Sequence, residues 1–202
     1  VVELCKKYNA WLMIDEAHSL GVLGEKGTGI EEHFNLYGEI DIKMGTLSKT
    51  IPSVGGYVAA NKDIITYLRH ASRAYIFSAA LPPAQAAAAN EAFKVILDEP
   101  ERIVKLNLNT KQFIGGLKSM GFDTMLTETA IVPVLCGDDM TAFAITREAQ
   151  LNDVFVLPVV SPAVPEGLAR LRATVTAAHD PSEIERAMDV IGEAGKKLGI
   201  IK

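Results

Sequence analysis

The sequence Gly45-Thr46-Leu47-Ser48-Lys49-Thr50, followed by the pair Gly55-Gly56, places a lysine at the end of a short apolar segment. Hydroxyl side chains stand on both sides of this lysine, and the two glycines let the backbone approach a ligand closely. A second dense stretch, Leu12-Met13-Ile14-Asp15-Glu16-Ala17-His18, lies upstream. It is typical of a strand buried on both faces that ends in a carboxylate and, shortly after, an imidazole. The two stretches predict an α/β protein with a ligand site at the carboxyl ends of neighbouring strands.

The bulk properties are those of an ordinary globular protein. The chain has 202 residues, of which 22% are charged, and a net charge of −5. This length allows one large or two small domains, and the acidic balance argues against nucleic acid or an anionic membrane as a partner. No apolar run reaches the roughly 18 to 20 residues that span a bilayer, and the N-terminus lacks a signal-peptide pattern. Cys5 and Cys136 form neither a metal-ligand spacing nor a disulfide framework, so we expect thiols in a reducing, cytoplasmic compartment.

Apolar periodicity and the positions of glycine and proline predict the order of the elements. Residues 11–14 and 40–47 are expected to be strands, and residues 56–60 a third. The third strand follows too closely for a crossover helix, which predicts antiparallel pairing with its predecessor. The other expected elements are the end of a helix at 1–8, a loop at 21–29, an extended segment at 75–78, helices at 62–71, 82–99, 101–120, 141–151 and 182–198, and strands at 130–135, 154–159 and 170–176. A domain change is expected near Pro100, between residues 1–99 and a smaller α/β domain of residues 100–202.

These strand ends carry the groups that pyridoxal 5′-phosphate (PLP) requires of a protein. The cofactor needs a lysine to hold its aldehyde and a carboxylate to keep its pyridine nitrogen protonated. Lys49 and Asp15 can supply these groups, and Thr46 and Ser48 offer hydroxyls for the phosphate. Arg172, on a late strand, is a candidate fork for the carboxylate of a substrate.

Each residue has an ordinary structural alternative when it is taken alone. Lys49 would most often be a surface lysine, and Asp15 could be a helix N-cap or the acid of a phosphate-binding enzyme. The absence of a G-x-x-x-x-G-K-[ST] motif excludes a P-loop NTPase. His18 could be a loop histidine, and Arg170 and Arg172 share one strand face, so one of them could be a surface residue. The remaining histidines have no partner at ligand spacing, so no metal site is predicted: His33, His70 and His179.

Taken together, four stretches resemble the α-oxoamine synthases, PLP enzymes of fold type I. They are IDEAHSLGVLGEKGTG (14–29), GTLSKTIPSVGGYVAA (45–60), YIFSAALPP (75–83) and ARLRATVTAAHDPSEIERA (169–187), in the order and spacing of that family. Members of the family are considerably longer than this chain. The resemblance therefore implies the C-terminal part of a PLP fold type I large domain, with a mostly parallel sheet, plus a smaller α/β domain.

The resemblance implies a role for each matching residue of the first domain. Asp15 would pair with the pyridinium nitrogen, and His18 would contact the phenolic oxygen of PLP. Lys49 would form the Schiff base, and Thr46 would bind the phosphate. Three of these residues form the implied catalytic set: Lys49, His18 and Asp15.

Three further positions follow from the same resemblance. Ser78 would reach the phosphate of the neighbouring subunit in a homodimer with a shared active site. Ala79 stands at a cofactor-binding position where the family often has Thr or Asn, so that one phosphate donor is lost or replaced. Arg172 would hold the carboxylate of the amino acid or of the product.

The implied activity is condensation of a small amino acid with an acyl-CoA or acyl-carrier thioester, usually with decarboxylation, to give an α-oxoamine. Two alternatives stay open. One is another fold type I activity, an aminotransferase or an aldolase-type lyase. The other is a non-catalytic fragment or partner subunit, which the short length favours and the presence of Lys49 opposes.

Overall fold

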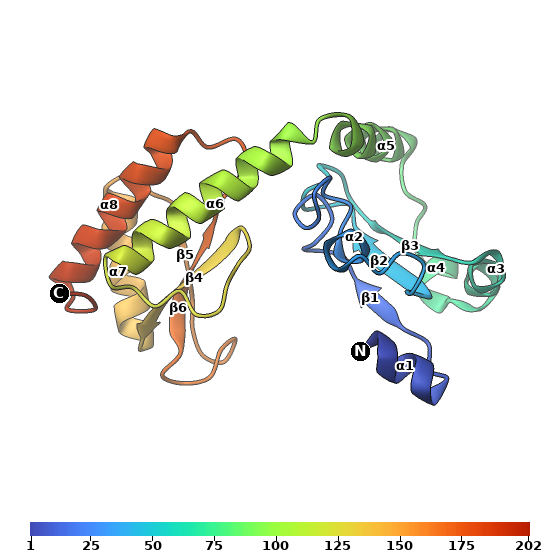
Figure 1. Ribbon diagram of the computed structural model, residues 1–202, viewed down its shortest axis with the longest axis horizontal. Coiled ribbons are helices and arrows are strands. Elements are labelled where there is room, and N and C mark those ends of the chain that lie inside the picture. Colours follow the sequence, from blue (N-terminus) through green and yellow to red (C-terminus); the bar gives the residue numbers. More distant parts are fainter. The chain divides into compact units, whose positions relative to one another are not determined.

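The computed structural model describes residues 1–202, which divide into two compact units, Val1–Ile103 and Val104–Lys202 (Figure 1). Each unit has its own small sheet. None of the helices is long and apolar enough to cross a membrane. The assignment of residues 1–99 and 100–202 to separate domains stays a prediction.

The first unit is built on a three-stranded sheet in the order β1-β2-β3 (Figure 1). Strand β1 (Met13–Asp15) runs parallel to β2 (Ile42–Thr46), and β3 (Gly56–Ala60) runs antiparallel to β2. The predicted antiparallel pairing of the third strand is therefore confirmed. Since β1 and β2 are parallel, their carboxyl ends lie at the same edge of the sheet.

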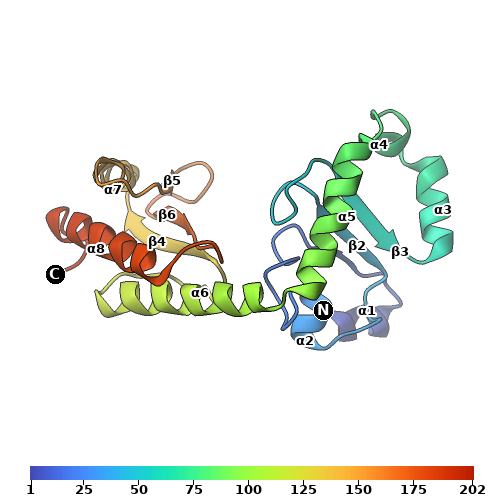
Figure 2. The ribbon, with the colours of Figure 1, turned by 90° about the horizontal axis from the view of Figure 1, so that it is seen from above.

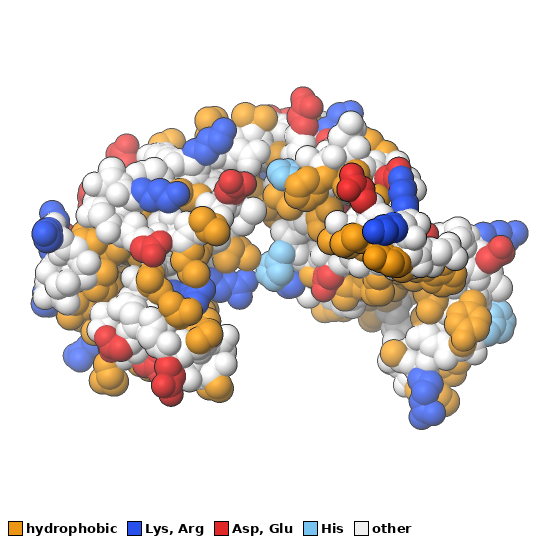
Figure 3. All heavy atoms as spheres, turned by 60° about the horizontal axis from the view of Figure 1, so that its bottom comes forward, with side chains coloured by type: hydrophobic (Ala, Val, Ile, Leu, Met, Phe, Trp, Pro, Cys, Tyr) orange, Lys and Arg blue, Asp and Glu red, His pale blue; other side chains and the backbone are white.

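Strand β1 differs from the expectation in its length and its burial. It begins at Met13 rather than at residue 11, and Met13 and Trp11 are 58% and 71% exposed. Strand β1 lies at the edge of the sheet and pairs with β2 on one side only. Its side chains therefore have fewer neighbours than those of a central strand. The space-filling view shows apolar side chains at many places on the face that it draws (Figure 3).

Five helices accompany this sheet: α1 (Val2–Tyr8), α2 (Ile30–Phe34), α3 (Lys62–Ala71), α4 (Arg73–Ile76) and α5 (Pro83–Asp98). Helix α4 corrects the expected extended segment at 75–78. Its first turn is capped by Ser72, whose hydroxyl accepts a hydrogen bond from the backbone N–H of Tyr75 at 3.4 Å. An N-cap serine outweighs the strand preference of so short an aromatic segment. Helix α2 was not predicted.

The second unit has a separate antiparallel sheet in the order β4-β6-β5, which places the last strand in the middle. The strands are β4 (Ile131–Gly137), β5 (Leu157–Val159) and β6 (Ala169–Thr174). Strand β5 is shorter than expected because pairing with β6 extends only from Leu157 to Val159. Along β6 the side chains alternate, so that Leu171 and Ala173 are buried while Arg172 is exposed.

Three helices complete the second unit (Figure 2): α6 (Glu101–Ser119), α7 (Asp139–Leu151) and α8 (Pro181–Lys197). Helix α7 contacts all three strands and α8. Helix α6 meets α8 where Gly116 leaves room for Met188, because a Cβ atom at Gly116 would lie 2.1 Å from the Met188 sulfur. The capping box predicted for α8 is present, with Asp180 and Glu183 each accepting a backbone N–H of the other residue.

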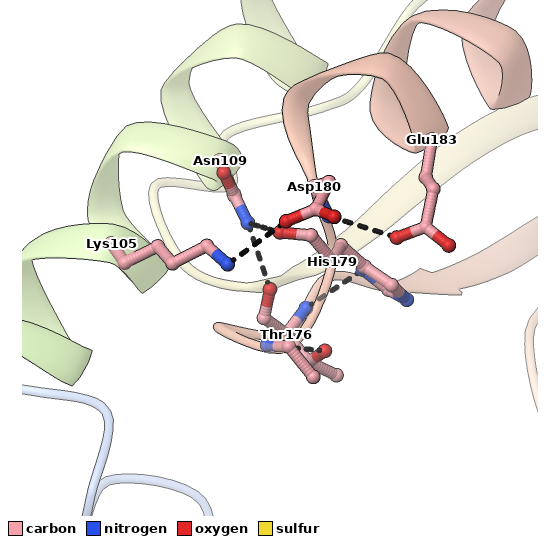
Figure 4. A network of polar contacts seen from close by, with 7 residues as sticks. Lys105, Asn109, Thr176, His179, Asp180 and Glu183 are labelled. Atoms are coloured by element: carbon pink, nitrogen blue, oxygen red, sulfur yellow. Dashed lines mark hydrogen bonds and ion pairs between the residues drawn. The ribbon is translucent and has the colours of Figure 1, made fainter.

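A polar network holds the connection between β6 and α8 (Figure 4). The buried Asn109 of α6 donates from Nδ2 to the carbonyls of Thr176 at 3.0 Å and His179 at 2.9 Å. The backbone N–H of Thr176 donates to Nδ1 of His179 at 3.2 Å, and Lys105 pairs with Asp180 at 3.3 Å. One helix face therefore fixes the loop that leads from the strand of Arg172 to α8.

Candidate active site

The parallel pairing of β1 and β2 brings the two singled-out stretches to one edge of the first unit. Asp15 lies opposite Met44 in the register of the two strands. The backbone N–H of Glu16 continues the ladder by donating to the Met44 carbonyl at 2.7 Å. The turn after β1 and the loop after β2 therefore start side by side, as the carboxyl ends of neighbouring parallel strands do.

Lys49 and His18 meet at this edge. Nζ of Lys49 lies 3.1 Å from Nε2 of His18, across 31 residues of sequence. Both side chains are exposed. A hydrogen bond between them requires one nitrogen to donate and the other to offer a lone pair, so the pair can share a proton. The structure thus brings together two residues that the sequence singled out separately.

The loop that carries Lys49 is anchored by apolar residues on either side of it. Leu47 and Ile51 are buried and form a small core with Ala89 of α5. Between them Ser48 and Lys49 are exposed. Burial of the flanking residues holds the loop in place, while the polar side chains stay available to a ligand.

Two hydroxyls lie next to the lysine. The Oγ atoms of Thr46 and Ser48 are hydrogen-bonded to each other at 2.9 Å, and Thr46 Oγ1 also donates to the carbonyl of Gly55 at 3.3 Å. Each hydroxyl has one proton, so a phosphate oxygen would replace one of these two acceptors. Asp15 uses one carboxylate oxygen, Oδ1, to accept the backbone N–H of Ala17 at 2.8 Å.

The other predicted positions lie on other segments of the chain. Ser78 and Ala79 follow α4 in an exposed segment. Arg172 belongs to the second unit, where it lines a cavity of about 490 Å³ and has no hydrogen bond or ion pair. Arg170 is different, because its Nε donates to the carbonyl of Leu168 at 2.9 Å.

The sequence analysis did not single out Glu16 or Ser19, which are both 4% exposed beneath the turn after β1. The hydroxyl of Ser19 donates to the Glu16 carboxylate. Burial first, and the negative charge of Glu16 second, raise the pKa of the nearby Tyr57 phenol. The only sequence signal was the adjacency of two acids at a strand end, of which the structure exposes Asp15 and buries Glu16.

Comparisons with known proteins identify the family of this chain. The family model described as aminotransferase class I and II matches residues 1–191. The 8-amino-7-oxononanoate synthase of Thermoanaerobacter pseudethanolicus is 45% identical over 201 residues, which cover 100% of this chain and 51% of that protein.

Solved structures of serine palmitoyltransferase (SPT) are also similar. The SPT of Sphingomonas wittichii is 30% identical, with a TM-score of 0.94 over 100% of this chain and 51% of that one. An SPT structure with a PLP internal aldimine is 35% identical, with a TM-score of 0.94 over 99% of this chain and 51% of that one. The chain therefore spans about half the length of the relatives it matches, and its α/β fold is that of half a PLP fold type I structure, as predicted. On this evidence the chain belongs to the aminotransferase class I and II family, in its α-oxoamine synthase group.

Proposed function

We propose that this protein is a PLP-dependent acyltransferase that joins a small amino acid to an acyl-CoA or acyl-carrier thioester, usually with decarboxylation. The observation that carries the proposal is the contact of Lys49 with His18, 3.1 Å apart, at the ligand edge of a chain of this family. The names of the similar proteins, 8-amino-7-oxononanoate synthase and serine palmitoyltransferase, support a thioester and an amino acid as substrates.

The residues at the strand ends fit the functional groups of PLP. The exposed amine of Lys49 suits its aldehyde, and the exposed carboxylate of Asp15 suits a protonated pyridine nitrogen. The imidazole of His18 suits the phenolic oxygen, and the hydroxyl pair of Thr46 and Ser48 suits the phosphate. When bound, PLP supplies an electron sink for the negative charge that develops at the α-carbon of the amino acid.

The residues of the chain would divide the remaining work among them. Nζ of Lys49 would hold the cofactor in the resting enzyme and then accept the α-proton of the amino acid as a general base. Asp15 would keep the ring nitrogen protonated through its carboxylate. Arg172 would bind the carboxylate of the amino acid, since no residue of the chain occupies its guanidinium donors.

We also propose a homodimer with a shared active site, in which Ser78 serves the phosphate of the neighbouring subunit. The side chain of Ser78 makes no hydrogen bond within its own chain. The segment before it is apolar and exposed: Tyr75 is 65% and Phe77 77% exposed. An exposed aromatic segment of this kind suits a subunit interface. Ala79 would contribute no hydroxyl there.

The experiment is an assay of thiol release from acyl-CoA by the full-length protein with PLP, over a panel of small amino acids. We expect release that requires both the amino acid and the thioester, and no keto acid. The variant Arg172→Ala should raise KM for the amino acid. Arg170→Ala, two residues earlier on the same strand, should leave KM near the wild-type value. Turnover that depends on a keto acid, or amino acid cleavage without a thioester, would replace the proposal by an aminotransferase or a lyase.

A further inference from the structure

The turn after β1 has two sides of opposite character. Asp15 and His18 are exposed on the ligand side, whereas Glu16 and Ser19 are each only 4% exposed on the other. The backbone closes the turn, because the N–H groups of Ser19 and Leu20 donate to the Glu16 carbonyl at 3.2 and 3.1 Å. His18 therefore projects from a turn in which the buried Glu16 lies two residues before it and the buried Ser19 directly after it.

The carboxylate of Glu16 ties this turn to a distant part of the first unit. It accepts the hydroxyl of Ser19, and both of its oxygens lie 3.1 Å from the backbone N–H of Ile30, the first residue of α2. Burying a carboxylate is costly unless hydrogen bonds satisfy it, and those to an ionised acceptor are the stronger kind. The bonds of Glu16 thus join the turn of His18 to the start of a helix 14 residues further along the chain.

The backbone lies close against this carboxylate. Gly29 has a φ of +109°, and a Cβ atom built on it would lie 2.5 Å from Oε2 of Glu16. Only glycine combines that backbone angle with such a close approach. Glu16 is therefore enclosed between Ser19, Gly29 and Ile30, and it cannot itself reach a ligand at the exposed amine of Lys49.

We propose that Glu16 is a positioning residue, which through Ser19 and Ile30 holds the turn so that Nε2 of His18 stays against Nζ of Lys49. The geometric part of this inference stands on the contacts above. The consequence for catalysis rests on the proposed function. Glu16 acts through His18 and touches neither cofactor nor substrate.

The test uses two variants of the full-length protein, Glu16→Gln and Ser19→Ala. Glu16→Gln keeps the shape of the side chain but removes its charge and one acceptor, and Ser19→Ala removes only the hydroxyl donor. The matched control is Glu32→Gln. Glu32 stabilises the segment before α2 by accepting the backbone N–H groups of Lys26 and Thr28, both at 2.9 Å. These bonds do not involve the turn of His18.

The first measurement is the NMR signal of the His18 ring in protein without cofactor, assigned with His18→Gln. We expect Glu16→Gln and Ser19→Ala to shift or broaden this signal while the signals of His70 and His179 stay in place, and Glu32→Gln to leave the His18 signal unchanged. In protein with PLP we expect kcat to fall roughly ten- to a hundredfold in the two variants, with KM for the amino acid little changed.

The outcomes separate the inference from the proposed function. An unchanged His18 signal in a folded Glu16→Gln protein, or an equal response to Glu32→Gln, would overturn the inference. If Glu16→Gln does not fold, Ser19→Ala decides the matter by the same criterion. If the unsubstituted protein shows no turnover while Glu16→Gln and Ser19→Ala displace the His18 signal, the proposed function is refuted and the positioning role is still supported.

Discussion

The side-chain nitrogens of Lys49 and His18 lie 3.1 Å apart, although 31 residues separate them in the sequence. Each comes from the segment that follows one of two parallel strands. An ammonium can donate to an imidazole nitrogen only if that nitrogen carries no proton, so the contact requires one nitrogen to donate and the other to accept. In the proposed function Lys49 holds the cofactor and accepts a proton, and His18 is the neighbour that this geometry gives it.

Replacement of Lys49 by alanine should abolish covalent attachment of PLP to the full-length protein, because this is the amine that lies at the strand ends. We expect kcat to fall by about three orders of magnitude or more, since both attachment and proton transfer are lost. The measurement is borohydride reduction followed by peptide mapping. Lys43→Ala is a suitable control, because Lys43 lies on β2 and forms an ion pair with Glu31 of α2. Cofactor still fixed to the Lys49→Ala protein would show that another lysine does this.

Replacement of Asp15 by asparagine should leave PLP bound but slow turnover by several orders of magnitude. A neutral amide cannot keep the pyridine nitrogen protonated, so the ring loses its capacity to withdraw electrons. The control is Asp41→Asn, because Asp41 accepts the backbone N–H of Leu12 at 2.8 Å at the other end of the same strands. Turnover and cofactor content should be measured together. Near-normal turnover of Asp15→Asn would remove Asp15 from this role.

The shared active site can be tested by complementation between inactive subunits. Ser78→Asp should repel the phosphate, and Lys49→Ala removes the cofactor amine, so each homodimer should be nearly inactive. Co-expression should restore about a quarter of wild-type activity, because half of the dimers are mixed and each contains one intact site. The two subunits would carry different tags, so that the mixed dimer can be purified and assayed. An inactive mixed dimer would mean that Ser78 serves its own subunit, and an active Ser78→Asp homodimer would mean that it serves neither.

The polar network of the second unit predicts a stability effect (Figure 4). Asn109→Ala should lower the free energy of unfolding by about 2 to 3 kcal/mol, because two carbonyls lose their donor in a buried position. Gln112→Ala is the matched control: Gln112, one turn further along the helix, makes a single bond of 3.3 Å to the carbonyl of Pro181, the first residue of α8. It should cost less than about 1 kcal/mol. Urea denaturation measures both, and equal costs would contradict the role given to Asn109.

Cys136 predicts how reactivity and stability depend on pH. Burial raises the pKa of its thiol from 9.0 to about 11. In a Cys5→Ser protein the remaining thiol should react with a disulfide reagent at pH 8 roughly a hundredfold more slowly when folded than in urea. Equal rates would contradict a buried thiol. Both cysteines are free, and a reducing cytoplasmic location stays a prediction.

The same shift fixes the sign of the stability effect. Below pH 9 the thiol is protonated in both the folded and the unfolded states, so Cys136 leaves stability unchanged. Above that pH the unfolded thiol ionises first, and the free energy of unfolding should fall until the pH passes the folded pKa of about 11. Cys136→Ala should remove this part of the pH dependence, as measured by denaturation at a series of pH values.

Local signals in the sequence were sufficient for much of the fold. Helix α8 begins with a capping box at Asp180 and a proline at its first position, and both were visible in the sequence. The antiparallel pairing of β3 followed from a connection too short for a crossover. Short helices were less accessible: α4 spans four residues, and its only local signal is the cap at Ser72. Its apolar residues predicted an extended segment instead.

The candidate site divides in the same way. The sequence by itself determined that a lysine, a carboxylate and two hydroxyls follow apolar strands, because residue type and local order are written in it. Only the tertiary structure decided that Lys49 meets His18, because this depends on the parallel register that sets Asp15 beside Met44. The burial of Glu16 was likewise decided by the tertiary structure: its partner Ile30 lies 14 residues away, and a hydrogen bond across that distance exists only once the chain has closed around it.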